Sequence, residues 1–152
     1  MRTSAHLHAA DDPELVRVPA VTYASVLGAG SPGTEEFYRK KNLIGEIASQ
    51  LGDGDSPVIE IQYWYPDGST PVEIANFYSV NPIPSLQYRV LVVIPDTTTE
   101  QQLTAARAVG ADARATDVVE LLAFPEHEVV QVMHHGPFAE EFATLERLGA
   151  FA

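Results

Sequence analysis

Hydrophobic residues change their spacing abruptly at Gly136, near the end of the chain. The segment 129–135 has the short apolar run of a strand, whereas apolar residues after the glycine recur every three or four positions, as on one helix face. These helical positions are Phe138, Phe142, Leu145 and Leu148. Pro137 suits the first position of a helix, because its missing N–H leaves no bond unmade there. We therefore predict a strand that ends at Gly136 and a helix that begins at Pro137.

The rest of the chain alternates between strand and helix patterns. One helix is predicted from a Thr34 cap to Gly52, and another from the capping box Thr99-x-x-Gln102 to Gly110. Alternating or continuous apolar residues predict strands over 15–27, 58–65, 72–80, 86–94, 118–124 and 128–134. Turn residues predict two hairpins, which pair 58–65 with 72–80 and 118–124 with 128–134.

The order of these elements is βαββ, then βαββ again, then a helix, which predicts an α+β fold. Because strands outnumber helices and neighbour one another, we expect a largely antiparallel sheet with helices on one face. The other face would be free to curve around a ligand. The length of 152 residues fits a single domain, with a loose tail at 1–12 and halves at about 13–84 and 85–152.

The strand at 58–65 carries the most chemical information. Successive side chains point to opposite faces of a strand, and we expect one apolar set to pack on a helix. That set is Ile59, Ile61, Tyr63 and Tyr65. Glu60, Gln62 and Trp64 share the other face, and a carboxylate, an amide and an indole together suit the wall of an aromatic pocket. The alternative is a solvent-facing side with one exposed tryptophan. In an apolar cleft Glu60 would have a raised pKa and would suit general acid or base chemistry.

The strand before Gly136 offers further ligand-binding candidates. One alternating set is Gln131, Met133 and His135, and the other is Val130, Val132 and His134. Which set faces a cleft depends on register, since a shift of one residue exchanges them. We expect the first set to contact the ligand.

Composition narrows the classes of partner and site. The net charge of −12 disfavours nucleic acids and anionic membrane surfaces, which both reward Lys and Arg. The chain has no cysteine, no secretory signal pattern and no apolar run near the roughly 18 residues of a membrane span, so we expect a cytoplasmic protein. His127, His134 and His135 do not have the spacing of a metal site, and we expect neither metal nor cofactor.

Four stretches resemble the GyrI-like small-molecule-binding family, which includes the effector-binding domains of AraC- and MerR-type regulators. They are Pro19–Tyr23 with the turn Gly28–Gly30, Glu60-Ile61-Gln62-Tyr63-Trp64, Arg89–Asp96 with Thr99-Glu100, and Gln131–Phe138. The last is similar to the signature Gln-x-x-His-x-Gly-Pro-Tyr of the family. The chain is closest in pattern to the stand-alone branch, some members of which hydrolyse cyclopropane-bearing natural products.

The resemblance implies a duplicated βαββ fold with a cleft between its halves, lined by aromatic residues and carboxylates. Tyr23 and His134 match family positions: Tyr23 would donate a hydrogen bond to a ligand carbonyl, and His134 is either a catalytic base or a hydrogen-bonded structural residue. The chain departs from the family at Phe138, where a phenol is usual, and ends at Ala152, before a usual Glu-x-Tyr hairpin. The second half of the pocket would then be absent from the protein, supplied by a second copy in a homodimer, or cut from this sequence.

Three functions remain open from the sequence. The first is binding of a hydrophobic or aromatic small molecule, to which an ionised Glu60 would add attraction for a cation. The second is hydrolysis of a strained or electrophilic natural product, with Glu60 as general acid or base. The third is an interaction domain whose sheet pairs with another chain. We favour the first, because the usual second acid of the family is missing.

Overall fold

The chain forms two compact units, which are described separately. The computed structural model describes residues 8–51, 58–110, 113–114, 117–137 and 140–152. The sheet unit comprises residues 21–67 and 83–124, and the ribbon unit comprises residues 1–20, 68–82 and 125–152. The predicted helix end at Gly52 and the signature residue Phe138 lie outside the described residues. None of the helices in the described part of the chain has the length and hydrophobicity of a membrane span.

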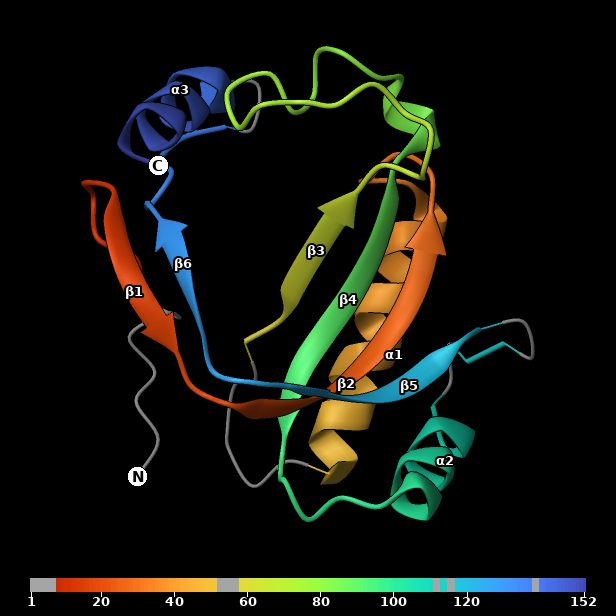
Figure 1. Cartoon of the computed structure of the whole chain (residues 1–152). Helices are drawn as coiled ribbons and strands as arrows, with labels where there is room; N and C mark the ends of the chain where they lie inside the picture. Colours follow the sequence, from red (N-terminus) through yellow and green to blue (C-terminus); the bar gives the residue numbers. More distant parts are fainter. Residues whose placement is uncertain (1–7, 52–57, 111–112, 115–116, 138–139) are drawn as a thin grey trace. The chain divides into compact units, whose positions relative to one another are not determined.

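The sheet unit is a four-stranded antiparallel sheet with two helices on one face (Figure 1). Its elements in chain order are β2 (Val21–Ala29), α1 (Glu35–Leu51), β3 (Glu60–Trp64), the short 3-10 helix η2 (Ile83–Ser85), β4 (Gln87–Ile94), α2 (Glu100–Ala108) and β5 (Val119–Phe124). The strand order is β3-β4-β2-β5. This arrangement confirms the predicted α+β class and the antiparallel pairing.

The sheet unit contains two interlocked β-α-β arrangements. β2 and β3 are joined through α1 with β4 between them, and β4 and β5 are joined through α2 with β2 between them. Ser25 pairs with Leu91 at the centre of the sheet, while Glu60 pairs with Leu91 and Glu120 pairs with Ser25. The two halves therefore have matching registers around this central pair, although the sequence shows no strict repeat.

The core of the sheet unit lies between the helices and one sheet face. The predicted stripe of α1 is buried at Phe37, Ile44, Ile47 and Ala48, and the predicted face of β4 is buried from Leu86 to Ile94 at every second residue. The rings of Phe37 and Tyr88 meet edge to face with centroids 5.2 Å apart. Gly28 is required here, because an added Cβ would lie 2.3 Å from Cζ of Tyr88.

Both predicted helix caps are present. The backbone N–H of Phe37 donates to Oγ1 of Thr34 at 3.2 Å, just before α1. At α2 the capping box is complete, because Gln102 N donates to Thr99 Oγ1 at 3.2 Å and Thr99 N donates to Gln102 Oε1 at 2.8 Å. Local side-chain chemistry thus fixes where both helices begin.

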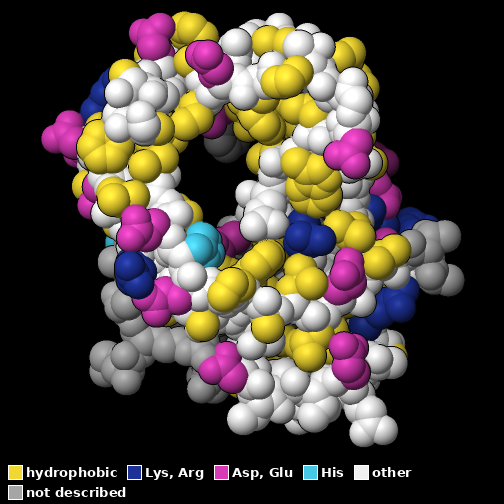
Figure 2. All heavy atoms as spheres, in the orientation of Figure 1, with side chains coloured by type: hydrophobic (Ala, Val, Ile, Leu, Met, Phe, Trp, Pro, Cys, Tyr) yellow, Lys and Arg dark blue, Asp and Glu magenta, His cyan; other side chains and the backbone are white. Residues whose placement is uncertain are grey.

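The ribbon unit contains β1 (Glu14–Val18), β6 (His127–Gln131) and α3 (Glu141–Phe151). β1 and β6 pair antiparallel and form a two-stranded sheet. Residues 70–80 contain turns and no strand, and Asn81 ties them together by accepting from Thr70 N at 3.0 Å and donating to Thr70 O at 2.7 Å. Figure 2 shows acidic side chains scattered over the visible surface rather than gathered in one patch.

Several sequence predictions about elements are wrong. Residues 15–27 form two strands, because Pro19 cannot donate to a ladder, and residues 72–80 form no strand. Neither predicted hairpin forms, since β3 pairs with β4 instead of residues 72–80, β5 pairs with β2 and β6 pairs with β1. The last helix begins at Glu141 instead of Pro137, after a turn in which Glu140 N donates to Pro137 O at 3.0 Å.

Candidate functional site

The sheet face that points away from α1 and α2 carries most of the predicted chemistry. We call it the helix-free face and define it by strand alternation and register. Its residues are Val21, Tyr23, Ser25 and Leu27 of β2, Glu60, Gln62 and Trp64 of β3, Gln87, Arg89, Leu91 and Val93 of β4, and Glu120, Leu122 and Phe124 of β5. The predicted division of the strand at 58–65 is confirmed, since Ile59, Ile61 and Tyr63 pack on the core with the helices.

Glu60 and Tyr23 form the central polar pair of this face. The Tyr23 side chain reaches across β4 toward the Glu60 carboxyl, and as a hydrogen-bond donor it lowers the pKa of that carboxyl. Tyr23 is almost fully buried among apolar residues and its ring meets Phe124 edge to face at 5.4 Å. Burial and the nearby Glu60 carboxylate raise the pKa of Tyr23 to about 12, so its hydroxyl stays protonated and can donate.

Burial is also the main influence on the pKa of the Glu60 carboxyl. It raises the pKa of Glu60 above its usual value, and the hydrogen bond from Tyr23 offsets part of this shift. One carboxyl oxygen, Oε2, is buried without a hydrogen-bond partner. The same is true of the Ser25 hydroxyl, which is completely buried one row from Tyr23. Unpaired buried polar atoms are uncommon and costly, so this part of the face is suited to a polar group of a bound molecule.

A second polar group lies next to Glu60 on the same face. The Arg89 guanidinium stacks over the Trp64 ring at 5.4 Å from its centroid, and Nη1 donates to Gln62 Oε1 at 3.4 Å. The Trp64 indole N–H donates to Gln87 Oε1 at 2.7 Å. Trp64 is therefore partly covered and held in place. The alternative from the sequence, a single exposed tryptophan on a solvent-facing side, does not describe this half-buried indole.

The remaining predicted site residues lie in the ribbon unit. Nδ1 of His134 lies 2.7 Å from Thr144 Oγ1 and Nε2 lies 3.0 Å from Pro137 O, so both ring nitrogens have partners. These contacts tie the end of the ribbon to α3 and match the structural alternative for His134. The catalytic alternative would require one of these contacts to open.

Gln131, Met133 and His135 make contacts near the amino-terminal segment of the ribbon unit. Gln131 Nε2 donates to Glu14 Oε1 at 2.9 Å, and this bond lowers the pKa of Glu14. Met133 N donates to Ala10 O at 2.8 Å, and its side chain is exposed. His135 Nε2 lies 2.6 Å from Asp11 Oδ1. The predicted residues thus form two groups, with Tyr23, Glu60, Gln62 and Trp64 together in the sheet unit and the others in the ribbon unit.

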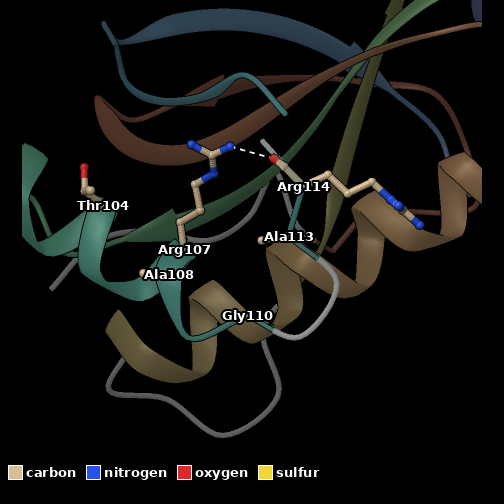
Figure 3. Close-up of a pocket in the computed structure, with 6 residues that line it drawn as sticks. All are labelled: Thr104, Arg107, Ala108, Gly110, Ala113 and Arg114. Atoms are coloured by element: carbon tan, nitrogen blue, oxygen red, sulfur yellow. Dashed lines mark hydrogen bonds between the residues drawn. The ribbon is translucent and has the colours of Figure 1, made fainter. Parts of the chain in front are cut away.

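The hollow beside α2 is a less suitable site (Figure 3). It has a volume of about 360 Å³ and is lined by Thr104, Arg107, Ala108, Gly110, Ala113 and Arg114. Arg107 is committed to backbone carbonyls, since Nη2 donates to Arg114 O at 2.7 Å and to Asp117 O at 3.0 Å. Within the described ranges, no three His, Asp or Glu side chains are grouped to hold a metal ion.

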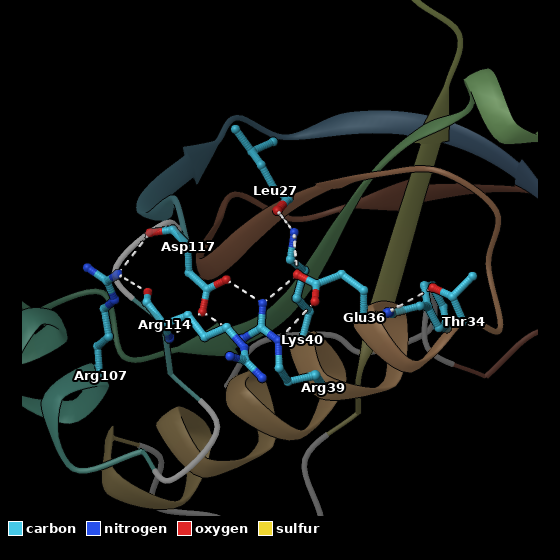
Figure 4. A network of polar contacts seen from close by, with 9 residues as sticks. Leu27, Thr34, Glu36, Arg39, Lys40, Arg107, Arg114 and Asp117 are labelled. Carbon is cyan, nitrogen blue, oxygen red and sulfur yellow. Dashed lines mark hydrogen bonds and ion pairs between the residues drawn. The ribbon is translucent and has the colours of Figure 1, made fainter.

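A buried ion-pair network near this hollow is structural (Figure 4). Arg39 of α1 donates to both carboxylate oxygens of Asp117, at 2.8 Å and 2.7 Å, and Lys40 donates to Leu27 O at 2.8 Å. The bonds from Arg39 lower the pKa of Asp117 and attach α1 to the segment before β5, and the bond from Lys40 attaches α1 to β2. The carboxylates of Asp117 and Glu36 both accept from Arg39, so their role among the described residues is internal attachment.

Three members of the helix-free face, Arg89, Ser25 and Glu120, were not predicted from the sequence. Arg89 is an isolated charge inside an apolar strand, and the alternation that placed Tyr88 and Val90 in the core also placed Arg89 opposite them. That signal was available in the sequence. The position of Glu120 depends on β5 pairing with β2, which has no local signal.

Comparisons with known proteins identify relatives by structure. No family model and no curated protein matches the chain. An uncharacterized conserved protein from Listeria innocua is 26% identical with a TM-score of 0.75, over 97% of this chain and 76% of that one. A hydrolase from Listeria innocua is 26% identical with a TM-score of 0.73, over 97% and 75%. A further hydrolase from Listeria innocua is 24% identical with a TM-score of 0.71, over 97% and 78%, and this likeness shows the fold.

Proposed function

We propose that this protein is a hydrolase that adds water to a small electrophilic molecule with an apolar body on the helix-free face. The observation that carries the proposal is the half-buried Glu60 side chain next to Tyr23, in which Oε2 is buried without a hydrogen-bond partner and burial raises the pKa. A carboxyl with a raised pKa retains its proton closer to neutral pH and therefore suits proton transfer to a substrate. The name of a structural neighbour at 26% identity, a hydrolase, supports the same reaction class.

The reaction would need one proton donor and one water molecule. Protonated Glu60 would give its proton to the atom that leaves the electrophilic carbon, or to a carbonyl oxygen conjugated with it. Water would form the new C–O bond as the strained or activated bond to that carbon breaks. The Glu60 carboxylate would then take a proton from the added water, so the enzyme returns to its starting state and only water is consumed.

Neighbouring side chains would support this chemistry without reacting. Tyr23 would orient the Glu60 carboxyl through its hydrogen bond, because its own pKa of about 12 keeps it protonated. Val93 and Leu122, which are both partly exposed, offer apolar surface next to the pair. The resemblance to the GyrI-like family supports an aromatic or cyclopropane-bearing natural product as the substrate.

Ligand binding without reaction is the second candidate function. It is supported by the fixed Trp64, whose indole N–H is held by Gln87 and whose ring stacks with Arg89. A rigid aromatic platform serves recognition whether or not a bond is broken. The two candidates differ in one observable, which is the mass of the recovered ligand.

The test is incubation of the protein with styrene oxide, phenyl acetate and a spirocyclopropyl cyclohexadienone, followed by mass spectrometry. A hydrolase gives the addition of water to at least one of them, or the two products of ester cleavage. Glu60→Gln should lower the rate by about 100-fold or more. Glu35→Gln, which changes an exposed glutamate in the first turn of α1, is the matched control. Unchanged ligands with a response of Trp64 fluorescence would favour the binding function, and normal turnover by Glu60→Gln would exclude the mechanism.

A further inference from the structure

Arg89 is the sole basic side chain in the four strands of the sheet unit, all of which the structure describes. The chain is strongly acidic, with 21 Asp and Glu against nine Lys and Arg. A carboxylate partner inside the protein would therefore be the ordinary arrangement for an arginine. Arg17, Arg39 and Arg147 each have such a partner.

Arg89 is held in place without a carboxylate from the described residues. Its guanidinium lies over Trp64, and its contact to Gln62 is long at 3.4 Å and involves a neutral amide. Its Nε is buried and has no hydrogen-bond partner. Among the described residues Glu60 is not its ion-pair partner, because burial and the Tyr23 hydroxyl account for the shift of the Glu60 pKa. A partly buried guanidinium with an unused N–H is costly unless an acceptor arrives from outside the protein.

The geometry favours a planar anion as that acceptor. An arginine presents parallel N–H groups that match the two oxygens of a carboxylate, and stacking on an aromatic ring fixes the plane of the fork. A phosphate would bring a larger negative charge close to Glu60 and would meet only one basic side chain on these strands. A carboxylate is therefore the better match in charge and in shape.

We infer that Arg89 binds a carboxylate of the substrate, so that the protein acts on apolar or aromatic carboxylic acids. This inference rests on the proposed function and names its substrate class. The backbones of the pair Gln62–Arg89 and the pair Glu60–Leu91 are neighbouring rows of the sheet, about 7 Å apart along the strands, and the Arg89 guanidinium lies over Trp64, which belongs to the next row away from Glu60. A molecule bound to Arg89 by its carboxylate would therefore have to extend along β3, past Gln62, for its far end to reach Glu60. The charge preference is opposite to the cation expected from an ionised Glu60.

The inference is tested by calorimetric titration of the full chain with 3-phenylpropionate and with 3-phenylpropionamide. These probes have the same size and shape, and only the first is anionic at neutral pH. We expect the carboxylate to bind about tenfold more tightly than the amide, as a charge-assisted hydrogen bond would give. Trp64 emission, measured in the same mixtures, should change with the carboxylate, because Trp64 lies under Arg89.

Three variants assign the preference to Arg89. Arg89→Gln should bind both probes with equal affinity, and Arg89→Lys should keep only part of the preference, since Lys lacks the planar fork. Arg114→Gln removes the same charge from an exposed side chain of the loop before β5 and should retain the full preference. Far-ultraviolet circular dichroism establishes that each variant is folded. Equal binding of the two probes by the natural protein, binding of neither, or a preference that survives in Arg89→Gln would overturn the inference.

The outcome can be separated from that of the proposed hydrolysis. A carboxylate preference without water addition to any substrate would retain the Arg89 site and reject the hydrolase. Water addition that depends on Glu60 without a carboxylate preference would retain the hydrolase and reject the Arg89 site. For an anionic substrate that is turned over, Arg89→Gln should raise KM about tenfold with little change in kcat, which a general structural defect would not do.

Discussion

At the scale of single residues, the proton chemistry of Glu60 depends on Tyr23. Burial raises the pKa of Glu60, whereas the hydrogen bond from the Tyr23 hydroxyl lowers it. Tyr23→Phe removes the hydroxyl and leaves the ring contact with Phe124 in place. The Glu60 pKa should therefore rise further in the variant. If protonated Glu60 is the acid, the alkaline limb of the rate profile should move to higher pH.

This prediction is measured as kcat/KM against pH with whichever substrate is hydrolysed, together with an NMR titration of the Glu60 carboxyl. We also expect kcat to fall by about tenfold or more, because the carboxyl loses its fixed orientation. Tyr38→Phe, which alters an exposed tyrosine of α1, is the control and should leave the profile unchanged. A Glu60 pKa that stays the same or decreases in Tyr23→Phe would contradict the role given to this hydrogen bond.

At the scale of elements, the attachment of α1 depends on the Arg39–Asp117 ion pair. The Asp117 side chain is 1% exposed and that of Arg39 is 10% exposed. Asp117→Ala leaves a buried guanidinium without its bidentate partner and should lower the free energy of unfolding by about 3 kcal/mol. Exposed Glu126→Ala, which removes a surface partner of Arg17, should lower it by about 1 kcal/mol or less. Urea denaturation measures both, and equal small effects would show that the pair does not anchor the helix.

The same pair predicts how stability changes with pH. The Asp117 pKa is lowered in the folded protein, so the unfolded state takes up its proton first as the pH falls. The stabilisation from Asp117 is therefore fully present above the ordinary aspartate pKa of about 4 and is lost as the pH falls through the lower folded value. Asp117→Asn should show a smaller loss of stability over this acid range. Parallel stability curves for the two proteins would contradict the assignment.

Elements whose pattern is local were predictable from sequence, and long-range pairings were not. The alternation of β4, the Thr34 cap of α1 and the capping box of α2 specify faces and starts by chemistry within a few residues. The face of Glu60, Gln62 and Trp64 followed from the same alternation. The proximity of Glu60 to Tyr23 could not be predicted in this way, because it requires β4 to lie between β2 and β3. Residues 72–80 show the opposite failure: their apolar residues suggested a strand, but they form turns held by asparagine side chains.

At the scale of the whole molecule, the two units differ in how much apolar surface they bury. Nearly all residues of the buried core belong to the sheet unit, and Val18 is the one exception among those described. In the ribbon unit α3 has no fully buried residue, and Phe142 and Phe151 are largely exposed. Because local opening is easiest where few apolar contacts are lost, the ribbon unit should open at a lower free energy than the sheet unit.

Hydrogen exchange followed by mass spectrometry tests this difference. Amides of β1, β6 and α3 should exchange before those of β2 and β4, whose residues form the centre of the four-stranded sheet. Connections between the units pass through Pro19-Ala20, Gly68, Pro82 and Pro125, so one unit can open without extending a strand or helix of the other. A binding probe that contacts only the helix-free face should slow exchange in β3 and β4 and leave α3 unchanged. Equal protection across both units would instead mean that they open together, and the exposed apolar residues of α3 would then have to be covered in solution.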